Sequence, residues 1–272
     1  MIEAGYINCP EGQIHFRQWL PEEEIRPPLL CLHPAPFSGL FFTRAMAALG
    51  QGRRVIAPDY PGYGASAPRV DQPGIEDYAV AMLQFVQEVS PDQPVDVLGF
   101  HTGCLVGAEM QLQSADSIDA LVLVDVPYFV GAAQEKMRDS AAKPLALDAE
   151  PESIVPLWKS GVGVKAPLMG MERSVALLSE QLRVYSRSHL AFHAAFTYPC
   201  PERFERLPGP VAIIGTQSGL LDATRESVAA AHESAFFIEA TEITRGVFEE
   251  GAPAIAARID EALQQVKGES SD

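Results

Sequence analysis

The chain has 272 residues, of which 47% are hydrophobic, and its formal net charge is −16. This length and apolar content predict one α/β domain with a large core and an inserted segment. An acidic surface repels phosphate backbones and anionic lipids, so neither nucleic acid nor a membrane is an expected partner.

The cysteine pattern favours a reducing environment. Cys9, Cys31, Cys104 and Cys200 form no CxxC pair and no metal-ligand spacing. Cys31 and Cys104 lie in apolar runs, where a free thiol packs as a small hydrophobic group. The first residues lack the basic region and apolar run of a signal peptide. These features predict free thiols and a cytoplasmic location.

Short apolar runs alternate with segments of helical periodicity along most of the chain. The predicted strands are residues 13–20, 29–33, 54–57, 95–98, 120–126, 211–214 and 235–239. The predicted helices are residues 41–50, 75–89, 103–113 and 252–266, followed by a frayed tail. Such alternation predicts an α/β fold with a doubly wound, mostly parallel sheet.

One long segment breaks this alternation. Residues 128–200 have helical patterns and no clear buried strand. We interpret them as a helical cap insert over the carboxyl ends of the strands, where open α/β sheets bind ligands. The predicted core is therefore residues 1–127 and 201–272. A cap of this kind commonly gates substrate entry.

Three motifs occur in order between the predicted strands. They are LLCLHPAP at 29–36, VIAPDYPGYGASAP at 55–68, and VDVLGFHTGCLVGAEM at 95–110. Together they resemble the α/β-hydrolase superfamily: its oxyanion turn, its Asp-x-Pro-Gly-x-Gly-x-Ser loop and its nucleophile elbow. The resemblance implies an α/β-hydrolase fold. It leaves the chemistry open, because this fold hosts many reactions.

The elbow departs from the family pattern at its centre. The segment reads Gly99-Phe100-His101-Thr102-Gly103, with His101 where the family has Ser, Cys or Asp. Histidine replaces an acyl-forming serine poorly, because an acyl-imidazole is labile. Its place on a strained turn predicts that His101 is functional. The alternative is a decayed site that His101 merely fills.

The other two positions of the family's triad also differ. Ser218 and Gly219 stand where the resemblance places the acid, and nearby Asp222 looks like the N-cap of the next helix. Arg245 stands where it places the histidine, while His232 precedes the last strand and is expected to face solvent. The triad is therefore interpreted as degenerate, which argues against ordinary serine-esterase chemistry.

The anion-stabilising parts of the family site are expected to survive. The backbone N–H of Thr102 opens a helix, and the N–H of Ala35 follows His33 and Pro34. Such amides form an oxyanion hole. Pro34 donates no N–H, so the hole depends on Ala35. His33 is expected to order this loop by a backbone hydrogen bond.

Further residues are candidates for the pocket wall. His189 and His193 are four residues apart, so they share a helix face that points into the pocket or packs. Without a nearby carboxylate or cysteine they predict no metal site. Asp125 ends a strand and is expected to bond backbone amides of the following turn. The aromatic candidates are Phe37, Phe41, Phe100, Tyr128 and Phe129.

The leading hypothesis is a cofactor-independent enzyme that performs non-covalent acid–base chemistry with His101. Lyase, decarboxylase, isomerase and water-activating hydrolase steps all fit. The expected substrate is a small, partly apolar carbonyl or carboxylate compound. Arg245 is expected to bind its negative charge and, together with burial, to lower the pKa of His101.

Two alternatives stay open at this stage. One is a catalytically inactive binding protein on the same fold. The other is a conventional hydrolase whose nucleophile lies elsewhere, which a fluorophosphonate probe would label. The sequence also leaves open whether the chain forms a homodimer.

Overall fold

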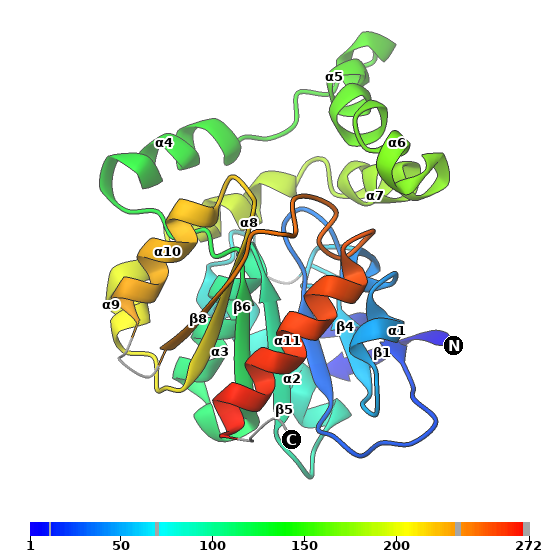
Figure 1. Cartoon of the computed structure of the whole chain (residues 1–272). Helices are drawn as coiled ribbons and strands as arrows, with labels where there is room; N and C mark the ends of the chain where they lie inside the picture. The colour runs from blue at the N-terminus through cyan, green and yellow to red at the C-terminus, as the bar shows by residue number, and fades with distance from the viewer. Residues whose placement is uncertain (11, 69–70, 232–234, 269–272) are drawn as a thin grey trace.

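The computed structural model of the chain describes residues 1–10, 12–68, 71–231 and 235–268. Its centre is an eight-stranded sheet with helices on both faces and a further helical layer above one edge (Figure 1). The predicted exposure of His232 lies outside the described residues, and so does the predicted frayed tail, residues 268–272, apart from Gly268.

The sheet has the strand order β1-β2-β4-β3-β5-β6-β7-β8. The strands are β1 Ile2–Cys9, β2 Gly12–Trp19, β3 Leu29–Leu32, β4 Val55–Pro58, β5 Val95–Phe100, β6 Ile118–Val124, β7 Val211–Thr216 and β8 Ala235–Ala240. From β4 to β8 all neighbours are parallel, whereas β2 pairs antiparallel with both β1 and β4. The predicted doubly wound, mostly parallel sheet is confirmed.

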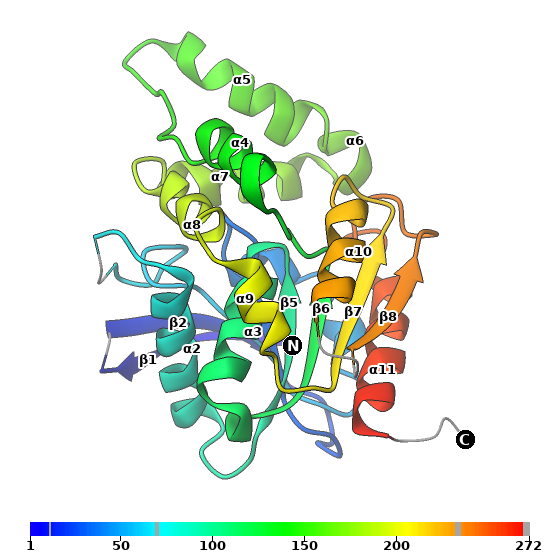
Figure 2. The same ribbon diagram turned by 90° about the vertical axis from the view of Figure 1, so that its left-hand side faces the viewer.

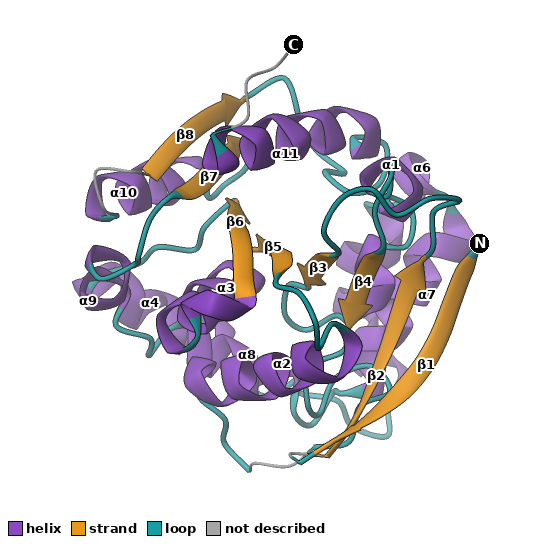
Figure 3. Ribbon diagram, turned by 90° about the horizontal axis from the view of Figure 1, so that it is seen from below, coloured by secondary structure: helices purple, strands orange, loops and turns teal. Residues whose placement is uncertain are grey.

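Helices cover both faces of this sheet, as the view from below shows (Figure 3). They are η1 Gly39–Phe42, α1 Met46–Leu49, α2 Ile75–Val89, α3 Thr102–Gln113, η2 Ala115–Ser117, α9 Cys200–Glu205, α10 Leu221–Ala230 and α11 Ala252–Lys267. Alternate residues of β3 serve opposite faces: Leu29 and Cys31 pack with α1 and α11, and Leu30 and Leu32 with α2 and α3. Burial on both faces explains why such strands are wholly apolar runs.

The second helical layer lies above the carboxyl ends of the parallel strands (Figures 1 and 2). Its elements are α4 Gly131–Ala141, η3 Pro151–Ile154, α5 Val155–Trp158, the π-turn η4 Lys159–Gly163, α6 Ala166–Met169, α7 Met171–Arg183 and α8 Ser188–Ala195. We call these elements the cap. The exact boundaries of core and cap remain predictions. No helix in the described ranges is long and apolar enough to cross a lipid bilayer.

Candidate functional site

His101 stands on the sharp turn between β5 and α3. Its backbone has φ 50° and ψ −118°, a conformation that residues other than glycine rarely adopt. Two hydrogen bonds hold the turn: His101 N–H donates to the Val124 carbonyl at 3.2 Å, and Cys104 N–H donates to the His101 carbonyl at 2.8 Å. Strain of this kind persists where the surroundings fix the conformation and is concentrated at functional sites.

The turn requires close backbone approach on both sides of His101. A Cβ atom at Gly103 would clash with the backbone carbonyl oxygen of Leu32. We therefore expect Gly103→Ala to lower the free energy of unfolding by about 3 kcal/mol, the upper end of the usual cost of overpacking, measured by urea denaturation. Gly107→Ala, one turn later, meets only side-chain atoms. This control should change stability by no more than about 1 kcal/mol, and equal losses in both variants would contradict the packing argument.

The His101 imidazole faces two adjoining chambers. The first, the aromatic chamber, has a volume of about 310 Å³, and the second, the apolar chamber, about 210 Å³. Both are lined by His101 and Ala35. The aromatic chamber is also lined by Phe37, Phe41, Phe100, Phe248, Asp125, Ser218, Lys165 and Glu249. The apolar chamber is also lined by Thr102, Phe129, Met137, Phe192 and Phe196.

Cap and core contribute jointly to these walls. Lys165 and Leu177 reach the aromatic chamber from the cap, and Met137 and Phe192 reach the apolar chamber from it. Residues of the cap and of the core therefore form the chamber walls together, and gating of substrate entry by the cap remains a prediction.

Burial makes His101 a neutral imidazole at pH 7. Although it keeps some surface toward the chambers, the surrounding protein lowers its pKa from the ordinary 6.5 to about 4, and the charge of Asp125 opposes this shift only in part. Removing a charged imidazolium from water is unfavourable, which is the dominant effect here. The direction agrees with the sequence expectation, but the charged neighbour involved is Asp125.

Arg245 does not form one site with His101. Its side chain is 66% exposed, and its Nε lies 3.8 Å from Glu250. The adjoining residues Gly246 to Glu249 line the aromatic chamber instead. The prediction that the Arg245 guanidinium lowers the His101 pKa is therefore wrong, because this side chain turns outward to solvent and to Glu250.

Asp125 is fully buried at the end of β6, with φ 54°. Its carboxylate accepts two hydrogen bonds from Thr216, one from the backbone N–H at 2.8 Å and one from the hydroxyl at 2.6 Å. The predicted partners were amides of the following turn. The observed partner lies on the adjacent strand β7, because β6 and β7 end at the same edge of the sheet.

Ala35 and Thr102, whose backbone amides are the predicted oxyanion donors, both line the apolar chamber with His101. Within the part of the chain that the structure describes, neither N–H donates to another protein group. Thr102 is also the first residue of α3, where amides point outward and the helix dipole favours negative charge.

His33 orders the loop that carries Ala35. Its Nε2 accepts the Tyr60 N–H at 3.1 Å, so its Nδ1 carries the proton and donates to the Pro34 carbonyl at 3.1 Å. Burial lowers the pKa of His33 to about 4. His33 is fully buried, and it is not among the described residues that line either chamber.

The remaining predicted pocket residues divide into two groups. Ser218 lines the aromatic chamber, and its hydroxyl accepts the Leu220 N–H at 3.2 Å. Asp222 does not reach the pocket: its side chain is 94% exposed and pairs with Arg225 at 3.0 Å. It lies in the first turn of α10, whose N-cap is Leu220, so the predicted capping position is two residues too late.

Tyr128 and the two cap histidines also differ from expectation. Tyr128 is buried against Phe204 and is not among the described chamber residues. His189 and His193 lie on α8, which turns Phe192 to the apolar chamber instead. His193 contacts Gln72, and burial lowers the pKa of His189. Phe192 and His193 are consecutive, so their side chains leave the helix about 100° apart, and His193 turns to Gln72 while Phe192 turns to the chamber.

The site also contains charged residues that the sequence did not single out. Arg173 of α7 donates to Glu249 at 2.8 Å, to Thr43 Oγ1 at 3.2 Å, and to the carbonyls of Leu40 and Phe41 at 3.1 and 3.0 Å. The two side chains are 7% and 4% exposed. This buried ion pair joins the cap to the core beside the aromatic chamber. A lone arginine in a polar-looking helix gives no sequence signal of it.

The two buried histidines predict acid lability. In the unfolded chain these two histidines take up protons near pH 6.5, whereas in the folded protein they stay neutral until about pH 4. Their contribution to stability is therefore present above pH 6.5 and is lost as the pH falls to about 4. Burial raises the pKa of Asp96 to about 6, which acts oppositely. The comparison that isolates His101 is therefore wild type against His101→Gln.

We expect the free energy of unfolding of wild type to fall by about 1.4 kcal/mol per pH unit more steeply than that of His101→Gln in this range. Urea denaturation at pH 6.5, 5.5 and 4.5 measures both slopes. Parallel slopes would show that His101 titrates alike in the folded and unfolded chain.

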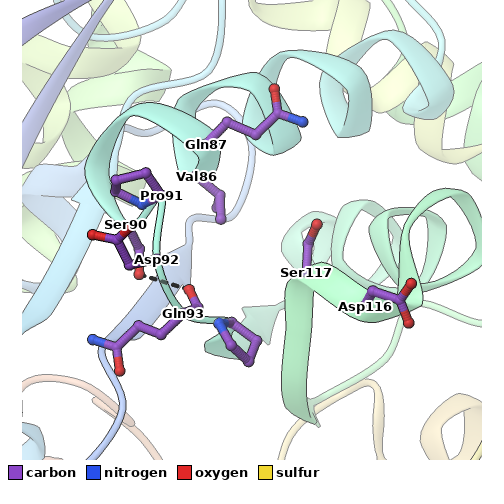
Figure 4. A pocket seen from close by; sticks show the side chains of 9 residues that line it. Val86, Gln87, Ser90, Pro91, Asp92, Gln93, Asp116 and Ser117 are labelled. Atoms are coloured by element: carbon purple, nitrogen blue, oxygen red, sulfur yellow. Dashed lines mark hydrogen bonds between the residues drawn. The ribbon is translucent and has the colours of Figure 1, made fainter.

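A separate hollow of about 320 Å³ lies at the opposite edge of the sheet, where α2 ends and β5 and β6 begin (Figure 4). Its lining includes Ser90, Asp92, Asp116 and Ser117, and Ser90 Oγ donates to the Gln93 carbonyl at 2.8 Å. Its lining is largely polar, whereas the two chambers at His101 are mostly apolar and adjoin the strained elbow, so the chambers are the candidate site.

Comparison with known proteins agrees with this architecture. A 3-hydroxybutyrate-oligomer hydrolase of Cupriavidus necator is 26% identical over 251 residues, covering 83% of this chain and 84% of that protein. The human serine hydrolase-like protein is 27% identical over 133 residues, which are 48% of this chain. The matched region spans 64% of that human protein.

A solved structure of the N-acyl homoserine lactonase AidH superposes with a TM-score of 0.73 at 19% identity, covering 100% of both chains. At this identity the superposition speaks for the fold alone. A family model described as the alpha/beta hydrolase fold matches residues 27–205. With the strand order and the elbow turn described above, this match shows that the chain belongs to the alpha/beta hydrolase fold family.

Proposed function

We propose that the chain is an enzyme that acts on a small, partly apolar carbonyl or carboxylate compound by acid–base chemistry without a covalent intermediate. His101 takes and returns the proton. The observation that carries the proposal is the position of His101: a neutral imidazole on the strained elbow, where two chambers and two unengaged amides meet. A neutral imidazole can accept a proton at pH 7.

The proposed chemistry assigns a separate task to each group. The N–H groups of Ala35 and Thr102 bind the substrate carbonyl oxygen and stabilise the charge that develops on it. His101 removes a proton from the adjacent carbon or from a water molecule and becomes an imidazolium. The carboxylate of Asp125, held by Thr216, stabilises that imidazolium electrostatically.

This assignment leaves no role for an activated serine. The family's elbow nucleophile is replaced by His101, and the hydroxyl of Ser218 is engaged by the Leu220 N–H. In this sense we interpret the triad as degenerate. The two relatives named as hydrolases support a substrate with a carbonyl group but not a particular reaction. Lyase, decarboxylase, isomerase and water-activating hydrolase reactions are all compatible.

Proton–deuterium exchange tests the proposal without knowledge of the natural substrate. Levulinate, a small keto acid with exchangeable α-protons, is incubated in D₂O with the enzyme, and exchange is followed by NMR. We expect wild type to accelerate exchange and a serine-directed fluorophosphonate to leave both the rate and the protein mass unchanged. Stoichiometric fluorophosphonate labelling, or absence of any acceleration, would overturn the proposal.

A further inference from the structure

The aromatic chamber contains a cation that has no carboxylate partner among the described residues. Lys165, at the N-terminal end of α6, lines this chamber together with His101. Its Nζ lies 5.4 Å from the centroid of the Phe37 ring. Among the residues that the structure describes, no carboxylate oxygen lies within 4.0 Å of this ammonium group. A half-buried ammonium ion without a counter-ion favours the binding of an anion.

Glu249, a carboxylate that also lines the aromatic chamber, already forms ion pairs with two arginines. It lies 2.7 Å from Arg173 and 3.3 Å from Arg44. Burial lowers the pKa of Lys165, and the charge of Glu249 opposes this shift. The other carboxylate of the lining, Asp125, accepts two hydrogen bonds from Thr216. Lys165 is therefore a cation of this wall whose charge no ion pair with a described residue offsets, although the chain as a whole carries −16. A local cation inside an acidic protein selects an anion that the remaining surface repels.

The aromatic side chains of the chamber indicate what the uncharged part of the ligand is. Four phenylalanine rings line it: Phe37, Phe41, Phe100 and Phe248. The Phe37 ring also holds the lysine ammonium by a cation–π contact, which reduces the entropy lost when a ligand is bound. A ligand that fits both features has one anionic end and an apolar body.

We propose that Lys165 binds the anionic group of the substrate, so that the enzyme acts on a carboxylate whose apolar part packs against the four phenylalanines. This inference rests on the proposed function and names its substrate class. It assigns to a cap residue the role that the sequence suggested for Arg245.

The test measures binding alone, with 3-phenylpropionate and its uncharged analogue 3-phenylpropanamide as probes in isothermal titration calorimetry. We expect wild type to bind the carboxylate at least tenfold more tightly than the amide. Lys165→Met should lose this preference, and Lys165→Arg should keep most of it. Arg245→Met is the matched control and should behave as wild type, because Arg245 is exposed and adjoins Glu250. Thermal unfolding verifies that each variant is folded.

Three results would overturn the inference: no carboxylate preference in wild type, an unchanged preference in Lys165→Met, or a loss of preference in Arg245→Met. The proposed function fails separately. If His101→Gln retains full exchange activity while Lys165→Met loses carboxylate binding, the acid–base role is wrong and the anion site stands. If His101→Gln loses exchange activity while Lys165→Met keeps its carboxylate preference, His101 remains the proposed base and Lys165 does not bind the anion.

Discussion

Replacing His101 with glutamine should lower the rate of levulinate proton exchange by 10²- to 10⁴-fold, the range that general acid–base catalysis contributes. Glutamine has a similar size and retains hydrogen-bonding groups, but it cannot accept a proton at neutral pH. The amides of Ala35 and Thr102 and the apolar walls remain in place. The affinity for 3-phenylpropionate should therefore change little while the rate constant falls.

The control for this variant is Asp222→Asn. Asp222 was a candidate from the sequence, but it is 94% exposed on α10. Its substitution should leave the exchange rate within twofold of wild type. Equal activity of His101→Gln and wild type would remove the histidine from the chemistry and favour the binding-protein alternative or a nucleophile elsewhere.

Replacing Arg173 with methionine should destabilise the protein by about 3–5 kcal/mol. Arg173 and Glu249 form a buried pair between α7 and the loop after β8, with further hydrogen bonds from Arg173 to the η1 segment. Removal of the arginine leaves the Glu249 carboxylate with only the partly exposed Arg44, 3.3 Å away. The expected result is a lower urea midpoint with the sheet structure retained.

A double variant separates the buried charge from the lost packing. Arg173→Met with Glu249→Met removes both charges, so it should recover most of the stability that the single change loses. The exposed Arg258, paired with Glu242 at 2.9 Å, supplies the surface control. Arg258→Met should cost no more than about 1 kcal/mol. A comparable loss at both arginines would contradict the account of the cap–core junction.

The sequence predicted the central sheet well for a physical reason. Strands buried on both faces are short apolar runs, so residues 29–33 and 120–126 could be recognised from composition alone. Strand β1 was not predicted, because it lies at the sheet edge and most of its residues are exposed. An exposed edge strand buries too little apolar surface to show a run of this kind.

The candidate site was predicted in part. Motif order placed His101 on the elbow, and Ala35, Thr102, Phe37 and Phe100 do line the chambers with it. The direction of side chains was harder to predict from the sequence. Arg245 follows the last strand, as expected, yet its side chain points to solvent. In a loop, the sequence fixes which element a residue follows, but tertiary packing decides where its side chain points.

Lys165 and the Arg173–Glu249 pair could not be found from the sequence. Each depends on how the cap docks on the core, and these residues come from segments that are far apart along the chain. Such long-range pairings leave no local periodicity to detect. The cytoplasmic location and the open question of a homodimer likewise remain predictions.

The central claim is that His101 is a neutral imidazole enclosed in the site and available as a base. An ¹⁵N NMR titration tests it directly, with the His101 signal assigned by its loss in His101→Gln. The account predicts that His101 is neutral at pH 5.5 and accepts its proton only near pH 4, because burial lowers its pKa. A half-protonation point at pH 6.5 or above would contradict the account, because it would mean that His101 is not enclosed by the protein as described.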